Sequence, residues 1–135
     1  MGKVCISVAH SAVSRGAENP KFGLDEYRLS DEQSKFVTGM LTEAGHQVYL
    51  FDTPTMRTRE YKHEKVRRAN AGDFDLCVEI HHNASGSPSV NYGMVIYDAR
   101  LEDSRLAAKV VSESLEQFVP WRWAGARNVH SSGAD

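Results

Sequence analysis

The segment Val4–His10 reads Val-Cys-Ile-Ser-Val-Ala-His, and the segment Leu76–His81 reads Leu-Cys-Val-Glu-Ile-His. Each is a short apolar run that leads into a polar loop, which is the pattern of a buried strand. In an open α/β sheet, ligands bind beyond the carboxyl ends of the strands. We therefore expect the imidazoles of His10 and His81 to project from the edge of a sheet where such folds carry out chemistry.

The overall composition is that of one globular domain. The chain has 135 residues, of which 41% are hydrophobic and 25% are charged, so it has enough apolar side chains to form a core. The net charge of −2 argues against a nucleic-acid partner held through its phosphates. No apolar run is long enough to predict a membrane span, and no signal peptide precedes the first expected strand.

Apolar periodicity predicts strands and helices in alternation. The expected strands cover residues 3–9, 47–51, 76–80 and 93–97, and the expected helices cover residues 30–44, 57–71 and 104–118. This order favours an α/β fold with three α/β/α layers, in which a mostly parallel twisted sheet carries helices on both faces. The sequence after Pro120 predicts no further element.

The first expected helix has two plausible starting points. Ser30 followed by Gln33 fits a capping box. A start near Asp25 would instead place Glu26 in the first turn. In that second arrangement Glu26 could join His10 and His81, and two histidines with one glutamate are a common protein shell for catalytic Zn²⁺.

Other chemistries find little support in the first loop. Residues 9–16 contain neither a dinucleotide-binding fingerprint nor a Walker lysine loop. The sequence also has no Gly-x-Ser-x-Gly nucleophile elbow. A doubly wound phosphate-binding domain with incidental histidines remains an alternative, and Glu18 and His82 remain alternative ligands.

Five short motifs, taken in order, resemble one family. They are Ala9–Ser11 at a strand end, Asp25–Tyr27 at a helix start, Arg67–Asn70, Ile80–Ser85 with a His-x-Asn-Ala pattern, and Gly93–Tyr97. The chain resembles the zinc-dependent N-acetylmuramoyl-L-alanine amidases of the amidase-3 type, which are found in autolysins and phage endolysins. This resemblance implies hydrolysis of the amide bond between N-acetylmuramic acid and L-alanine in peptidoglycan.

The resemblance also assigns roles to individual residues. It implies that His10, Glu26 and His81 hold Zn²⁺, and it selects His81 over His82 because the family pattern is His-x-Asn. Glu26 is preferred to Glu18 because the start of a helix fixes its position. The substrate is expected to be the muramoyl peptide of the bacterial wall.

Three further polar residues lie near the second histidine. Glu79 is unusual inside an apolar strand, where it is either a partner of a lysine or arginine or a support for His81. His82 is expected to support the site or to face the substrate. Asn83 opens a loop, residues 83–92, that is expected to border the substrate groove.

One element of the family pattern lies outside the sequence. The resemblance implies a glutamate on a later strand that acts as general base and acid, whereas the last glutamate here is Glu116 and the last acid is Asp135. We therefore interpret residues 1–135 as an amidase catalytic domain that lacks its C-terminal strand and helix, with the base beyond Asp135 and no wall-binding domain. A module that binds zinc and muropeptide without turnover is the alternative. Without a signal peptide, the expected location is the cytoplasm until lysis.

Overall fold

The computed structural model describes residues 1–87, 89–90 and 93–118, and the backbone of residues 124–128. The chain divides into two compact units, Met1–Ala84 and Ser85–Asp135. Each unit has parallel strands and at least one helix, and each is described by itself below.

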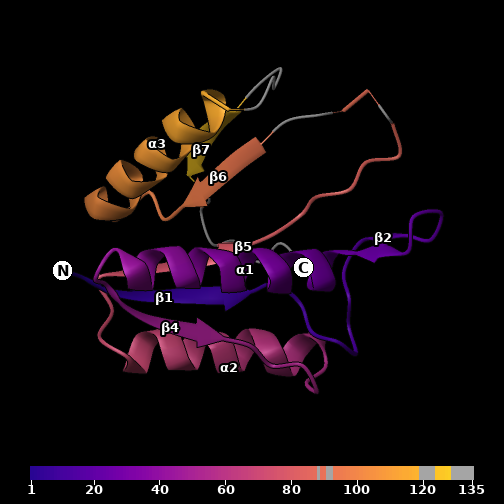
Figure 1. The fold of residues 1–135 in the computed structure, drawn as a ribbon, viewed down its shortest axis with the longest axis horizontal. Helices are drawn as coiled ribbons and strands as arrows, with labels where there is room; N and C mark the ends of the chain where they lie inside the picture. Colours follow the sequence, from indigo (N-terminus) through magenta and orange to yellow (C-terminus); the bar gives the residue numbers. More distant parts are fainter. Residues whose placement is uncertain (88, 91–92, 119–123, 129–135) are drawn as a thin grey trace. The chain divides into compact units, whose positions relative to one another are not determined.

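The first unit is a parallel sheet between two helices. Its strands are β1 (Lys3–Val8), β4 (Gln47–Phe51) and β5 (Leu76–Ile80), and their order is β4-β1-β5. The helices α1 (Glu26–Glu43) and α2 (Thr58–Ala71) lie on opposite faces of this sheet (Figure 1). The predicted fold class, α/β with a mostly parallel sheet and helices on both faces, is confirmed.

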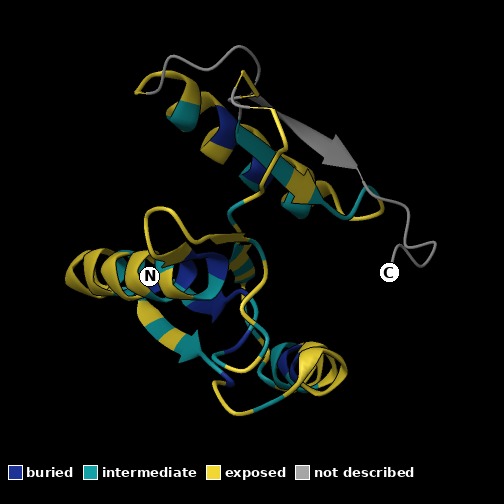
Figure 2. Cartoon of the chain, turned by 90° about the vertical axis from the view of Figure 1, so that its right-hand side faces the viewer, coloured by how far each residue is buried: buried dark blue, intermediate teal, exposed yellow. Residues whose placement is uncertain are grey.

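The core of this unit is centred on β1. The buried apolar residues of β1 and of the residue after it are Val4, Cys5, Ile6, Val8 and Ala9. Figure 2 shows this burial between the two helices. As the central strand, β1 pairs with β5 in register, with Val8 opposite Ile80. The histidines that follow these two strands therefore come from adjacent positions at one edge of the sheet.

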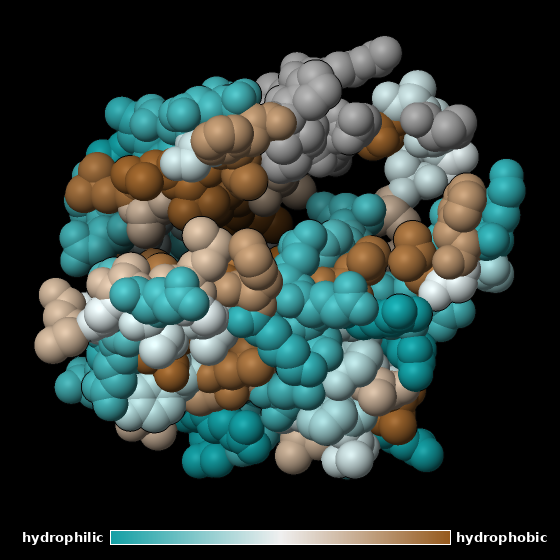
Figure 3. All heavy atoms as spheres, viewed as in Figure 1, coloured by the Kyte–Doolittle hydropathy of each residue, from teal (hydrophilic) through white to brown (hydrophobic). Residues whose placement is uncertain are grey.

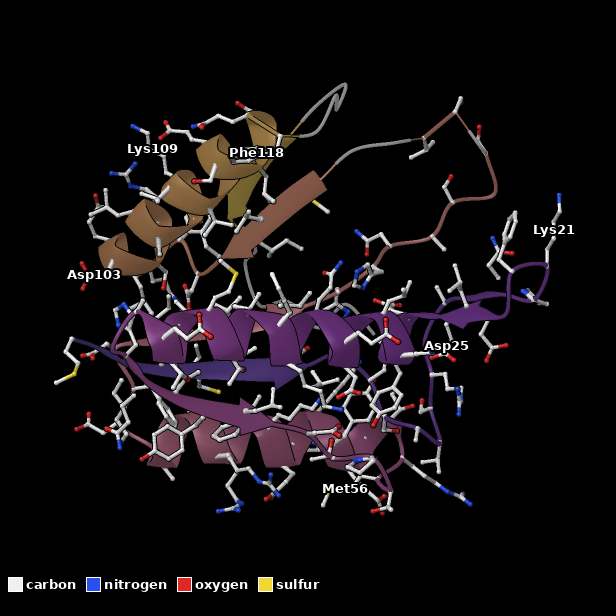
Figure 4. All side chains as sticks on the ribbon, in the orientation of Figure 1. Lys21, Asp25, Met56, Asp103, Lys109 and Phe118 are labelled. Carbon is white, nitrogen blue, oxygen red and sulfur yellow. The ribbon has the colours of Figure 1, made fainter. Side chains whose placement is uncertain are left out.

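The start of α1 follows the earlier of the two predicted positions. Asp25 is the N-cap, and its side chain accepts a hydrogen bond from the Arg28 backbone N–H at 2.8 Å. Figure 4 shows Asp25 at this end of the helix. The predicted capping box at Ser30 and Gln33 is wrong, because both residues lie within the helix.

Ser30 instead connects α1 to the sheet. Its buried hydroxyl donates to the Ile80 carbonyl at 2.6 Å and accepts the Ala9 backbone N–H at 2.7 Å. These two hydrogen bonds hold the helix against the carboxyl ends of β1 and β5. A serine that satisfies backbone groups in this way stabilises the buried helix–sheet contact.

Two short strands precede α1 and were not predicted. β2 (Glu18–Asn19) and β3 (Leu24–Asp25) pair antiparallel in the loop between β1 and α1. A strand of two residues has no periodicity to detect, which explains why the sequence did not indicate this hairpin.

The second unit contains β6 (Gly93–Tyr97), α3 (Glu102–Glu116) and β7 (Ala124–Asn128), with β6 and β7 parallel. The prediction that no element follows Pro120 is wrong for β7, whose sequence of Ala-Gly-Ala-Arg-Asn has weak strand propensity. Apolar side chains of α3 reach the surface of this unit (Figure 3). Within the described part of the chain, no helix is long and apolar enough to cross a membrane.

Candidate metal centre

The structure brings together the three predicted metal ligands. His10 lies two residues beyond β1, Glu26 is the first residue of α1, and His81 directly follows β5. One ligand atom from each lies within 4.8 Å of the others. Residues from three separated parts of the sequence therefore meet at the carboxyl edge of the sheet, as the strand pattern predicted.

Glu26 is the centre of this cluster. Its Oε2 atom lies 3.0 Å from Nε2 of His10 and accepts the Ala17 backbone N–H at 3.1 Å. Its Oε1 atom lies 3.0 Å from Nδ1 of His81 and accepts the His82 backbone N–H at 2.9 Å. The side chain is only 7% exposed, so these contacts fix both carboxylate oxygens.

These contacts also determine the charge of Glu26. Burial alone would raise its pKa, but the backbone N–H groups of Ala17 and His82 stabilise the carboxylate. The imidazoles of His81 and His10 add to this effect, and the net result is a pKa below the usual value. Glu26 is therefore a carboxylate anion at neutral pH.

His10 is held by an unusual backbone conformation and by α2. Its φ angle is +61°, in the left-handed region that residues other than glycine adopt infrequently. Its Nδ1 atom lies 3.1 Å from the Tyr61 hydroxyl, and its carbonyl accepts a hydrogen bond from Lys65 at 3.1 Å. Burial and the nearby carboxylates raise the pKa of Tyr61, so this contact is with a neutral phenol.

His81 is held by a second carboxylate. Its Nε2 atom lies 2.7 Å from Oε1 of Glu79. This hydrogen bond raises the pKa of His81 above its usual value, against the opposing effect of burial. Glu79 also lies 3.6 Å from the ammonium group of Lys65, so both sequence interpretations of Glu79 describe contacts that exist.

The remaining predicted residues lie near the cluster without joining it. The His82 side chain contributes no ligand atom, and among the described residues its buried Nδ1 has no hydrogen-bond partner. Burial lowers the pKa of His82. Glu18, the alternative acidic ligand, is exposed in β2 and is not in the cluster.

An open cleft of about 740 Å³ surrounds the three ligands. Asn83, Glu79 and Tyr61 line it together with two cationic side chains, Arg15 and Lys62. Arg15 is paired with Asp25 at 2.6 Å. The cleft therefore exposes the cluster to solvent and to a polar substrate.

Tyr61 and Lys65 are the site residues that the sequence did not identify. They lie in the charge-rich helix expected over residues 57–71, where Tyr61 is 3% and Lys65 is 5% exposed. Their spacing of four residues places both on one helical face, which is the signal that was available. A lysine is rarely buried without a partner, so its role becomes visible only once Glu79 is placed beside it.

The chemistry of this donor set fits zinc. Two imidazole nitrogens and one carboxylate oxygen form the three-ligand shell that catalytic zinc sites use, with one position left for water or substrate. The carboxylate is ionised and buried, and its two oxygens face the two histidines. Among the described residues this is the one group of such side chains that is close enough to hold an ion.

The family model for N-acetylmuramoyl-L-alanine amidases, Amidase_3, matches residues 4–132. The chain therefore has the α/β fold of an amidase catalytic domain and belongs to the Amidase_3 family. No curated protein matches the chain in sequence.

Solved structures agree with this membership. The catalytic domain of the CD27L endolysin targeting Clostridia difficile is 25% identical, with a TM-score of 0.76 over 94% of this chain and 71% of that chain. The amidase AmiC2 of Nostoc punctiforme is 27% identical, with a TM-score of 0.70 over 93% and 68%. The CwlD amidase of Clostridioides difficile, solved in complex with the GerS lipoprotein, shares the fold at 18% identity, with a TM-score of 0.77 over 96% and 74%.

Proposed function

We propose that this chain is a zinc-dependent hydrolase that cleaves the amide bond between N-acetylmuramic acid and L-alanine in peptidoglycan. The observation that carries the proposal is the His10–Glu26–His81 cluster, in a chain that belongs to the N-acetylmuramoyl-L-alanine amidase family. The similarity to a solved endolysin domain supports a role in lysis. We place the protein in the cytoplasm until it reaches the wall.

Each residue of the cluster would have a separate role in holding the ion. His10 and His81 would hold the ion through Nε2 and Nδ1, the nitrogens that face Glu26, and Glu26 would supply the anionic oxygen. A bound zinc ion would polarise the scissile carbonyl and lower the pKa of a water molecule. Asn83 and the cationic side chain of Lys62 line the cleft, where they would orient a polar, anionic peptide.

The general base is a separate requirement. Both carboxylates at the centre are already engaged, Glu26 by the histidines and Glu79 by His81 and Lys65. The proposed hydrolysis therefore needs a general base other than these two carboxylates. Because neither carboxylate is available as the base, we also keep the alternative that these 135 residues bind zinc and muropeptide without turnover.

Zinc content and wall lysis test the proposal together. The purified chain should retain zinc after gel filtration, and a His81→Ala variant should lose it. The neighbouring His82→Ala variant is the matched control, because the His82 contact to Glu26 comes from the backbone N–H. If the chain lowers the turbidity of purified cell walls and a chelator stops this decrease, the result supports hydrolysis. If the chain retains zinc but the turbidity does not decrease, the result supports the module that binds without turnover. If His81→Ala and His82→Ala lose zinc equally, the choice of His81 over His82 as a ligand is contradicted.

A further inference from the structure

Glu79 lies on the opposite side of the His81 ring from Glu26. The Nε2 atom of His81 contacts Oε1 of Glu79 at 2.7 Å, while the Nδ1 atom contacts Oε1 of Glu26 at 3.0 Å. The shorter of the two contacts is therefore the one that faces away from the cluster. A carboxylate accepts hydrogen bonds and donates none, so Nε2 donates to Glu79, and Nδ1 would be the nitrogen that gives up its proton when the cluster holds an ion.

Glu79 is itself held in place from two other elements. The Ser7 hydroxyl of β1 donates to its Oε2 atom at 2.7 Å, and the Lys65 ammonium group of α2 lies 3.6 Å from the same oxygen. Ser7 is 7% and Lys65 is 5% exposed, so both are buried polar groups directed at one carboxylate. Ser7 and Glu79 are also opposite each other in the pairing of β1 with β5.

Lys65 extends this arrangement to the other histidine. Its ammonium group donates to the carbonyls of Val8 and His10, at the end of β1. The same group thus contacts the backbone of His10 and the carboxylate that contacts His81. Burial lowers the pKa of Lys65 while Glu79 opposes this effect, so the carboxylate compensates a buried charge.

We propose that Glu79 is a positioning residue, which holds the His81 ring with Nε2 protonated and so would leave Nδ1 as the nitrogen that binds the ion beside Glu26. The inference rests on the proposed zinc site. Ligating histidines are commonly oriented by a carboxylate on their far nitrogen, and losing such a partner typically weakens metal binding about 10- to 100-fold. Ser7 and Lys65 fix the carboxylate, and the carboxylate fixes the ring.

A merely structural role for Glu79 makes a different prediction. If Glu79 only neutralised Lys65, Glu79→Gln and Glu79→Ala would be equally harmful, because both remove the charge. If Glu79 orients His81, glutamine should restore part of the loss, because its amide oxygen still accepts a hydrogen bond from Nε2. The conservative variant thus separates the two roles.

The test measures zinc affinity by competition with a chromophoric chelator and the His81 tautomer by nitrogen-15 NMR. We expect Glu79→Ala to bind zinc about 10- to 100-fold more weakly, and Glu79→Gln to fall between it and the unaltered chain. Glu32→Gln, an exposed glutamate on α1, should match the unaltered chain. In the zinc-loaded chain the His81 Nε2–H signal should be present, and Glu79→Ala should lose or broaden it.

Each outcome bears on a different statement. An unaltered chain that takes up no zinc overturns the zinc site and this inference with it. Zinc uptake by the unaltered chain with equal affinity in Glu79→Ala overturns this inference alone. Equal losses in Glu79→Ala and Glu79→Gln with an unchanged tautomer also overturn it. Should Glu79→Ala fail to fold, the affinity and tautomer of Glu79→Gln decide.

Discussion

A histidine follows each of the strands β1 and β5 and contacts Glu26, and the two histidine rings are held in place by different contacts. The far nitrogen of His10 contacts the neutral hydroxyl of Tyr61 at 3.1 Å, whereas the far nitrogen of His81 contacts the Glu79 carboxylate at 2.7 Å. The His10 side chain is 20% exposed and the His81 side chain is 45% exposed. The more exposed histidine thus has the charged partner.

The backbone conformations of the two histidines also differ, and here His10 is the more constrained residue. His10 follows a buried central strand and has a φ angle of +61°, a conformation that the surrounding contacts must maintain. No such conformation marks His81. The first histidine is therefore positioned mainly by its backbone and the second mainly by its side-chain partner. Substitutions should affect the two ends accordingly.

The largest loss should come from the residue that both ends share. Glu26→Gln removes the anionic ligand and leaves one amide oxygen for contacts that now use two carboxylate oxygens. We expect zinc affinity to fall more than about 100-fold, beyond the range for residues that only orient a ligand. Competition with a chromophoric chelator measures this loss.

Glu18→Gln is the matched control for Glu26. Glu18 is exposed in β2, so the same change of charge should leave zinc affinity within about twofold of the unaltered chain. A larger loss in Glu18→Gln than in Glu26→Gln would reverse the choice of acidic ligand and end the comparison of the two strands.

The next effect should come from Gly16, which lies beside the His10 ring and Glu26. Gly16 has a φ angle of +78°, and a Cβ atom there would lie 2.6 Å from the His10 ring and 2.7 Å from Oε2 of Glu26. Gly16→Ala should therefore displace both ligands and reduce zinc affinity at least about tenfold. The cost in folding free energy should be about 1 kcal/mol or more, because alanine also disfavours this backbone conformation.

Gly23→Ala separates the two causes. Gly23 has a φ angle of +62°, but a Cβ atom there would meet nothing within 4 Å. This variant should show a similar backbone cost in thermal unfolding and an unchanged affinity for zinc. If both variants bind zinc equally well, Gly16 is required only for its backbone conformation, and a Cβ atom there does not disturb the ligands.

The sequence predicted those parts of this site that follow from regular structure. The two apolar runs predicted β1 and β5, and the carboxyl-edge rule placed His10 and His81 together. Glu26 followed from the acidic start of a helix. The positions of these residues could be predicted because each depends on local periodicity and on one rule of topology.

The partners of the histidines depend on packing between elements, which periodicity does not encode. Lys65 looks like one more charge in a helix rich in charge, and its burial becomes apparent only when α2 packs against the end of β1. The strained φ of His10 and the role of Gly16 likewise arise from the folded loop. The strand β7 was missed because its small and polar residues have no strand pattern.

A smaller effect is expected from the neutral partner of His10. Tyr61→Phe removes the hydroxyl but keeps the ring in the core, so the loss is one uncharged hydrogen bond, about 1 kcal/mol. Zinc affinity should therefore fall about fivefold, less than in Glu79→Ala. Tyr27→Phe is the control, because its hydroxyl contacts Asp52, away from the cluster. A loss in Tyr61→Phe equal to that in Glu79→Ala would make the two ends equivalent.

The smallest effect on zinc should come from Asp25, which caps the helix that carries Glu26. Asp25→Ala removes the cap at Arg28, which should lower the free energy of unfolding by about 1 kcal/mol at neutral pH. Burial tends to raise the pKa of Asp25, but the Arg28 N–H and the Arg15 guanidinium lower it below its ordinary value of 3.8. The stabilising contribution is therefore present above about pH 4 and is lost as the pH falls through the lowered pKa.

The difference in stability between Asp25→Ala and the unaltered chain should accordingly be constant from pH 7 to about pH 5 and shrink below about pH 4. Denaturant unfolding of the zinc-free chains at each pH measures it, with Glu32→Ala as an exposed control on the same helix. A difference that persists undiminished to about pH 2 would mean that the cap acts without its charge. Zinc affinity at neutral pH should change less than in Tyr61→Phe, because the contacts of Glu26 to the histidines and to two backbone N–H groups remain.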